Sequence, residues 1–179
     1  MIYYALTAVA EKLNAYFRNR FALGQDKVII SGIVNQDGSI AITDPDKVVL
    51  TLVNLQQETV GRINIPNNNP SIHINLFVLF SVYFNENNYA EGLKFLSAVI
   101  SFFQANNVLN HQNTPDLDEN IDKLVFEMVN QDFQNLSYLW GVLGGKYLPS
   151  VLYKVRMITF QEGNITGDLS LFKGLGNNL

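Results

Sequence analysis

The sequence predicts an α/β (α+β) domain in which a mixed, mostly antiparallel β-sheet is flanked by an N-terminal helix and a second main helix. Two segments, 2–23 and 88–105, carry apolar residues every three or four positions, as one face of a helix does. Several other segments are rich in β-branched and aromatic residues, which is typical of strands. The 179 residues, of which 47% are hydrophobic, are enough for one substantial core.

The first third of the chain is predicted to form one helix and two strands. Residues 2–23 form an amphipathic helix for which Gly24 is the expected C-cap. A short β-branched strand over 27–33 is followed by turn residues at 35–39. A second strand over 47–56 is apolar on both faces, which predicts a central position in the sheet.

The middle of the chain is predicted to form a loop, a strand and a helix. Residues 66–70 hold two prolines and three asparagines, so they favour turns over a regular ladder, and such loops often carry partner contacts. Residues 72–84 alternate with the period of two expected of a strand. Residues 88–105 form the second main helix, packed on the sheet.

The last third is predicted to hold two further strands around a short helix. A polar segment over 111–120 precedes a strand over 121–130. The helix over 132–143 ends at the glycine pair 144–145, and the last strand covers 151–160.

We expect a single domain over 1–160 and a C-terminal tail over 161–179. The tail spaces its apolar residues among glycines and polar residues, which suits a segment that orders on a neighbouring surface. A frayed terminus is the alternative interpretation.

Composition argues against several classes of protein. The net charge is −4 and Lys and Arg form no run, so nucleic acid is a poor partner. The absence of Cys excludes disulfides and thiolate chemistry and is compatible with a reducing cytoplasm. The N-terminus does not resemble a secretion signal, and the longest apolar run, 76–84, is far shorter than the ~20 residues of a membrane helix.

No motif in the sequence predicts a catalytic, cofactor or metal site. His73 and His111 lie far apart and have no metal-ligand spacing, and we interpret His73 as a residue on the polar face of a strand. The acidic run 116–119 lacks the spacing and glycine of an EF-hand. Residues 144–146 lack the rest of a phosphate-binding loop. Enzymatic activity is therefore not expected.

Three aromatic residues near the glycine pair allow two interpretations. Trp140, with Tyr138 and Tyr147, would suit an aromatic ligand pocket. Such residues more often pack in cores or protein interfaces, and we favour that interpretation.

The order of three motifs resembles a known family. These are the strand beginning at 69–76, the helix over 89–103, and the segment 139–155, which reads LWGVLGGKYLPSVLYKV. Together they are similar to the tail-terminator (cap) family of extracellular contractile injection systems, which includes the caps of the Photorhabdus virulence cassette and the antifeeding prophage. The likeness extends from the first helix to residue 160.

The resemblance implies a phage tail-terminator-like fold and a structural role. Members would form a homohexameric ring on the baseplate-distal end of the inner tube, stop elongation and anchor the last sheath layer. The implied partners are other copies of the chain, the inner tube protein and the sheath protein, without nucleic acid or membrane insertion. Assembly in the cytoplasm would precede incorporation into an extracellular or membrane-anchored particle.

We expect the contacts of such a ring in one loop, one turn and the tail. The predicted interface residues are Asn67, Asn68, Asn69, Lys146, Tyr147, Ile165, Leu169, Leu171 and Phe172. Two other functions remain open: a tube-to-sheath or baseplate-side adaptor of the same particle, and a small-ligand-binding domain.

Overall fold

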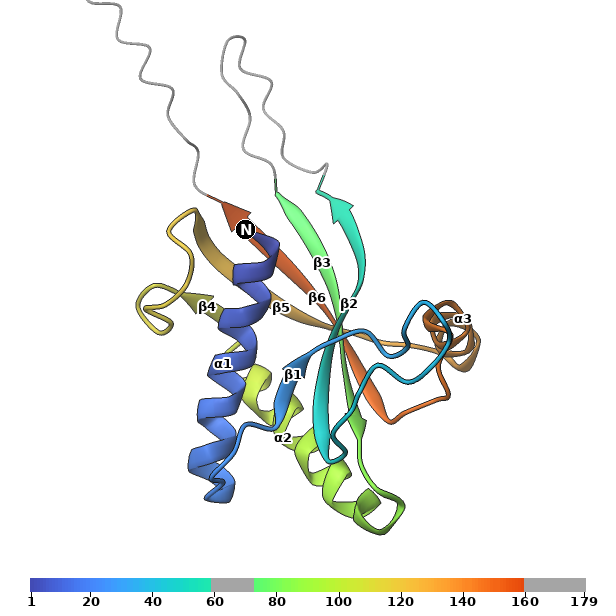
Figure 1. Ribbon diagram of the computed structural model, residues 1–179. Coiled ribbons are helices and arrows are strands. Elements are labelled where there is room, and N and C mark those ends of the chain that lie inside the picture. The colour runs from blue at the N-terminus through green and yellow to red at the C-terminus, as the bar shows by residue number, and fades with distance from the viewer. Residues whose placement is uncertain (59–72, 160–179) are drawn as a thin grey trace, which may run out of the picture.

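A computed structural model describes residues 1–58 and 73–159 of the chain. In this part, a six-stranded sheet carries two long helices on one face, while a third helix lies on the other side (Figure 1). The helices are α1 (Ile2–Phe21), α2 (Tyr89–Ala105) and α3 (Phe133–Leu143). The strands are β1 (Val28–Ile30), β2 (Lys47–Gln57), β3 (Ile74–Tyr83), β4 (Val108–Asn110), β5 (Ile121–Val129) and β6 (Ser150–Thr159). A 3₁₀ turn, Glu86–Asn88, leads into α2.

The strand order is β1-β2-β3-β6-β5-β4, and only the β1–β2 pair in it is parallel. This arrangement confirms the predicted mixed, mostly antiparallel sheet. β2 lies between β1 and β3, in agreement with the interior position predicted from its two apolar faces. No helix within the described ranges is both long enough and apolar enough to span a bilayer.

The larger core lies between the sheet and the two long helices. Phe17 of α1 packs edge-on against Phe95 of α2 with ring centroids 5.2 Å apart, so the two helices meet over the sheet. Phe103 of α2 stacks on Phe126 of β5 at 4.2 Å and contacts Tyr153 of β6 at 4.9 Å. These aromatic contacts fix α2 across the strands because large rings bury much apolar area in defined geometries.

A second, smaller core lies on the opposite face. Val49, Leu79 and Leu152, from three neighbouring strands, point to this side and are buried. The loop after β1 covers them with Ile33 and Ile42, and α3 contributes Trp140, which completes the cluster. Because both faces are covered here, the central strands are apolar on both sides.

The structure corrects the predicted boundaries in two places. α1 ends at Phe21, and Ala22 takes the left-handed conformation (φ 51°) in place of the predicted cap at Gly24. The earlier turn brings the chain back so that the Lys27 and Val28 amides reach the Asn14 side chain. The strand predicted over 27–33 is confined to Val28–Ile30, because Ile33 leaves the sheet plane to join the second core.

One strand was not predicted, and two predicted segments lie outside the described residues. β4 is three residues long and pairs with β5 immediately after α2, so its apolar pattern is too short to recognise. The predicted loop over 66–70 and the tail over 161–179 are not among the described residues.

Candidate interaction surface

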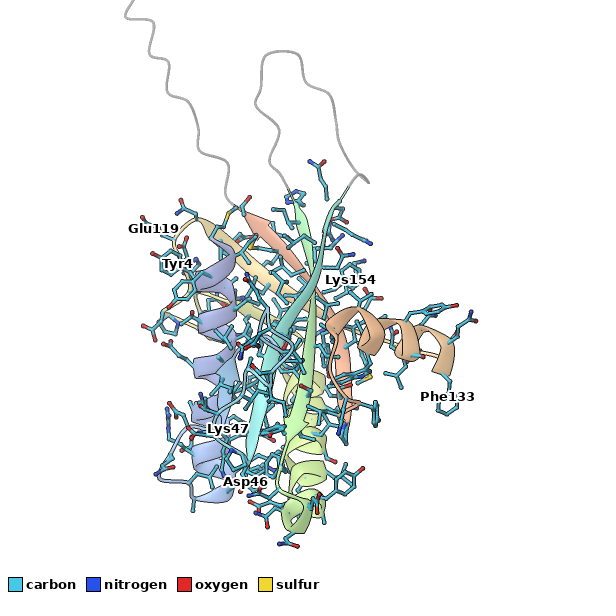
Figure 2. The ribbon with its side chains drawn as sticks, turned by 45° about the vertical axis from the view of Figure 1, so that its right-hand side comes forward. Tyr4, Asp46, Lys47, Glu119, Phe133 and Lys154 are labelled. Atoms are coloured by element: carbon cyan, nitrogen blue, oxygen red, sulfur yellow. The ribbon has the colours of Figure 1, made fainter. Side chains whose placement is uncertain are left out.

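The helix α3 projects from the side of the sheet, with Phe133 at its far end (Figure 2). Asp132 begins the helix by accepting a hydrogen bond from the Asn135 amide at 2.7 Å, and Gly144 ends it in the left-handed conformation (φ 68°). Both boundaries agree with the predicted helix over 132–143. Only Trp140 of this helix is buried, and the rest projects from the body of the protein (Figure 2). We therefore call α3 the arm.

The inner stripe of the arm continues beyond the body of the protein. Leu136, Trp140 and Leu143 follow helical spacing and pack on the second core. Phe133 is next on the same stripe, one turn before Leu136, yet its residue surface is 91% exposed. Phe133 therefore does not pack on the second core in the described structure. The apolar stripe of the helix extends one turn beyond the part of the core that it covers.

The outer surface of the arm is uncharged, and two large apolar or aromatic side chains lie on it among the polar Gln134, Asn135 and Ser137. Tyr138 and Val142 are 63% and 83% exposed. From residue 133 to 145 the sequence has no Asp, Glu, Lys or Arg. Solvated helices normally carry charges on their outer face, whereas the centres of protein interfaces are depleted in charge and enriched in aromatic residues. The arm therefore has the composition of a contact surface.

Trp140 anchors the base of the arm. It is buried in the second core, and its ring meets that of Tyr147 at 5.7 Å with an interplanar angle of 68°. Tyr138 is exposed elsewhere on the helix. The three aromatic residues therefore do not form a common ligand pocket, and Trp140 belongs to the core as we favoured.

A cavity of about 450 Å³ lies at the base of the arm, where the turn after α3 meets the loop after β1. We call it the base pocket. Its lining residues are Ile33, Val34, Gly38, Ile40, Ile42, Tyr83, Gly144, Gly145, Lys146, Tyr147 and Leu148. The two segments touch closely, because a Cβ atom on Gly145 would lie 2.6 Å from Cγ2 of Ile33.

Two of the predicted interface residues, Lys146 and Tyr147, are exposed at this pocket. Sequence reasoning missed the opposite wall, including Ile40, which is 56% exposed. The signal was present, since Ile33 and Val34 precede the polar turn 35–39 and Ile40 and Ile42 follow it. Their convergence with residue 147 required the tertiary fold.

The other predicted interface residues lie outside the described residues. They are Asn67, Asn68 and Asn69 in the loop and Ile165, Leu169, Leu171 and Phe172 in the tail. Their role in contacts stays a prediction.

Potential catalytic groups are dispersed in the described part of the chain. No group of three or more His, Asp or Glu residues there is placed to hold a metal ion. The Nε2 atom of His111 lies 2.8 Å from the Ile121 carbonyl oxygen, in the turn after β4. Asp46 accepts hydrogen bonds from the Asn85 amide and the Asn88 side chain, both at 3.1 Å, which is a structural role.

A second cavity of about 460 Å³ lies beside α1 and the turn at 114–116. It is lined by charges of both signs, including Glu11, Lys12 and Asp116. Within it, Arg18 pairs with Asp26 at an exposed site. Exposed ion pairs of this kind are common on surfaces and indicate no particular chemistry.

Comparison with known proteins identifies both a family and a fold. The family model described as the Pvc16 N-terminal domain matches residues 5–168. A cryo-EM structure of the sheath/tube terminator of PVC, an extracellular contractile injection system, in its extended state has a similar fold, with a TM-score of 0.62 at 16% identity. So has a cryo-EM structure of the anti-feeding prophage tube-terminating cap, with a TM-score of 0.57 at 15% identity.

These matches cover 100% and 98% of this chain but 64% and 60% of the two solved chains, so the chain spans less than two thirds of either. No curated protein matches it. Because the family model covers most of the sequence, the chain belongs to the Pvc16 N-terminal domain family.

Proposed function

We propose that the chain is a structural cap of a contractile injection system. In this role it ends elongation at the baseplate-distal end of the inner tube and sheath and anchors the last sheath layer. The observation that carries the proposal is the family match over residues 5–168, supported by the fold shared with a sheath/tube terminator and a tube-terminating cap.

The proposed assembly is a homohexameric ring that contacts the inner tube protein and the sheath protein. A ring needs two different patches on each subunit, one facing each neighbour. We propose the uncharged arm and the base pocket, two separate features of the described surface, as these patches. We further propose a single domain over 1–160 that carries a contact loop at 67–69, followed by a tail over 161–179 that also makes contacts.

The same proposal makes the protein non-enzymatic. Its contribution is mechanical, because a cap must hold while the sheath shortens, and many modest contacts around a ring add up through avidity. We propose that it assembles in the cytoplasm and then becomes part of an extracellular or membrane-anchored particle.

Electron microscopy of particles from a strain lacking the gene tests this function. Particle length and sheath state are scored against the parent strain and against the deletion strain carrying the gene on a plasmid. We expect absent particles, or abnormally long or uncapped ones, with restoration by the plasmid. Particles of normal length with an intact distal cap would contradict the proposal and return attention to an adaptor role.

A further inference from the structure

We propose that the far end of the arm docks into the base pocket of a second copy of the chain, with Phe133 as the anchor. This inference rests on the proposed function, because it names the contact through which neighbouring copies in a ring would hold one another. It is argued from the reach of the helix, the fit of the pocket and the charges beside it.

The arm cannot fill the pocket of its own chain. α3 has 11 residues, so at 1.5 Å per residue it is about 16 Å long. The turn 144–148, which lines the pocket, follows its last residue directly. Phe133 therefore stands a full helix length from the pocket beside it, and only another molecule can bring such a side chain there.

The pocket suits an apolar anchor. Isoleucine, valine and leucine side chains line it together with the Tyr83 and Tyr147 rings, and its volume of about 450 Å³ lies in the range of sites that bind compact apolar groups. Aromatic side chains that enter such pockets contribute most of the affinity at many interfaces. Phe133, at 91% exposure, is the most exposed large hydrophobic residue of the described chain.

One pair of opposite charges flanks the two surfaces, and the exposed Asp37, next to Gly38 of the pocket wall, is a further acidic group beside them. Asp132 is exposed and directly precedes Phe133 at the end of the arm. Lys146 is exposed and is the one charged residue among those lining the pocket. Seating Phe133 in a neighbouring pocket would bring the two opposite charges to the same rim, which favours this partner over a surface of arbitrary sequence.

The contact is heterologous, since the arm and the pocket are different surfaces. Each copy can offer one arm and receive another, and repetition of such a contact closes a ring when the rotation between copies allows it.

Site-directed cross-linking tests the contact, and the natural absence of Cys makes it specific. Gln134→Cys protein, which keeps Phe133 and carries the thiol on the exposed neighbouring residue, is mixed with Ile40→Cys protein at high concentration and treated with a short bismaleimide. We expect a cross-linked heterodimer well above the yield from a mixture of Tyr89→Cys and Ile40→Cys proteins. Tyr89 is a matched control because it is 55% exposed on α2, away from the arm. Equal yields in the two mixtures would overturn the proposal.

Charge and anchor variants provide an independent measurement by sedimentation of the full chain. Phe133→Asp is expected to weaken self-association by about tenfold or more, the effect of losing a buried anchor. Asp132→Asn is expected to weaken it less and to reduce its salt dependence, since Asn caps a helix as well as Asp does but lacks the charge. Self-association unchanged in Phe133→Asp, with the helical circular dichroism retained, would overturn the contact.

The two proposals fail in different ways. If the cross-link forms but particles without the gene are normal, the arm contact stands and the cap function is wrong. If particles need the gene but Phe133→Asp protein caps them as well as the wild type, the cap function stands and the arm contact is wrong.

Discussion

Asn14 is a buried polar residue that joins α1 to β1. Its Oδ1 atom accepts hydrogen bonds from the Lys27 and Val28 amides at 3.0 and 2.8 Å, and its Nδ2 atom donates to the Val28 carbonyl at 3.0 Å. The helical pattern alone did not single it out, because Asn14 appears there as one of the polar residues between apolar positions. Its role depends on β1 returning to the helix, which no local pattern specifies.

Asn14→Ala should therefore destabilise the fold. The substitution leaves buried backbone groups of β1 without partners, so we expect the free energy of unfolding to fall by about 2–4 kcal/mol. Urea denaturation measures the change. Glu11→Ala, on the exposed side of the same helix, is the control and should change it by less than about 0.5 kcal/mol. Similar losses in both variants would contradict the role of Asn14.

Tyr153 makes stability sensitive to alkaline pH. Burial raises the pKa of its phenol from 10.0 to about 12. As the pH rises, the unfolded chain loses this proton first, so the folded state binds more protons and loses stability between these two pKa values. The contribution is fully present below pH 10.0, the ordinary pKa of the group.

Tyr153→Phe should remove this part of the alkaline loss. We expect the variant to lose less stability than the wild type between about pH 9 and 11, because Phe has no proton to release. Urea denaturation at the two pH values provides the comparison. If both proteins lose the same amount of stability, groups other than Tyr153 cause the loss of stability at alkaline pH.

At the scale of elements, the arm was the most predictable part of the candidate surface. Asp132 and the glycine pair are explicit boundary signals, and the structure places α3 between them. The direction of the arm was not predictable, because it depends on how Trp140 sits in the second core. The base pocket was also missed, since its walls come from segments about 100 residues apart.

A pair of glycine substitutions tests how tightly the base of the arm is packed. A Cβ atom at Gly145 would lie 2.6 Å from Cγ2 of Ile33, so Gly145→Ala should lower the free energy of unfolding by about 1–3 kcal/mol. At Gly141, inside α3, no atom lies within 4 Å of the added Cβ. Gly141→Ala should instead raise it by about 0.5–1 kcal/mol through helix propensity. Equal effects at both positions would contradict the close contact with Ile33.

At the scale of the whole molecule, the sheet order brings the ends of β2 and β6 and the start of β3 to one end of the fold (Figure 1). The apolar patterns predicted these strands individually. Their order could not be read from the sequence. The last strand, β6, lies next to β3, although α2, β4 and β5 come between them in the chain (Figure 1). The resemblance to tail terminators supplied the fold that the local patterns left open.

Deletion of residues 163–179 tests the proposed division into domain and tail. We expect a folded monomer with an unchanged unfolding midpoint, because the two cores are built within the described residues. Binding to other copies or to sheath should be weaker. An unfolded or strongly destabilised truncated protein would make the tail part of the core and contradict the division.

The central claim is that this chain caps the end of the tube that lies farthest from the baseplate. The most direct measurement is electron microscopy of intact particles in which the chain carries a gold-labelled N-terminal tag, with the position of the label scored along each particle. We predict label at the baseplate-distal end alone. Label at the baseplate, or distributed along the sheath, would contradict the account and make the protein an adaptor.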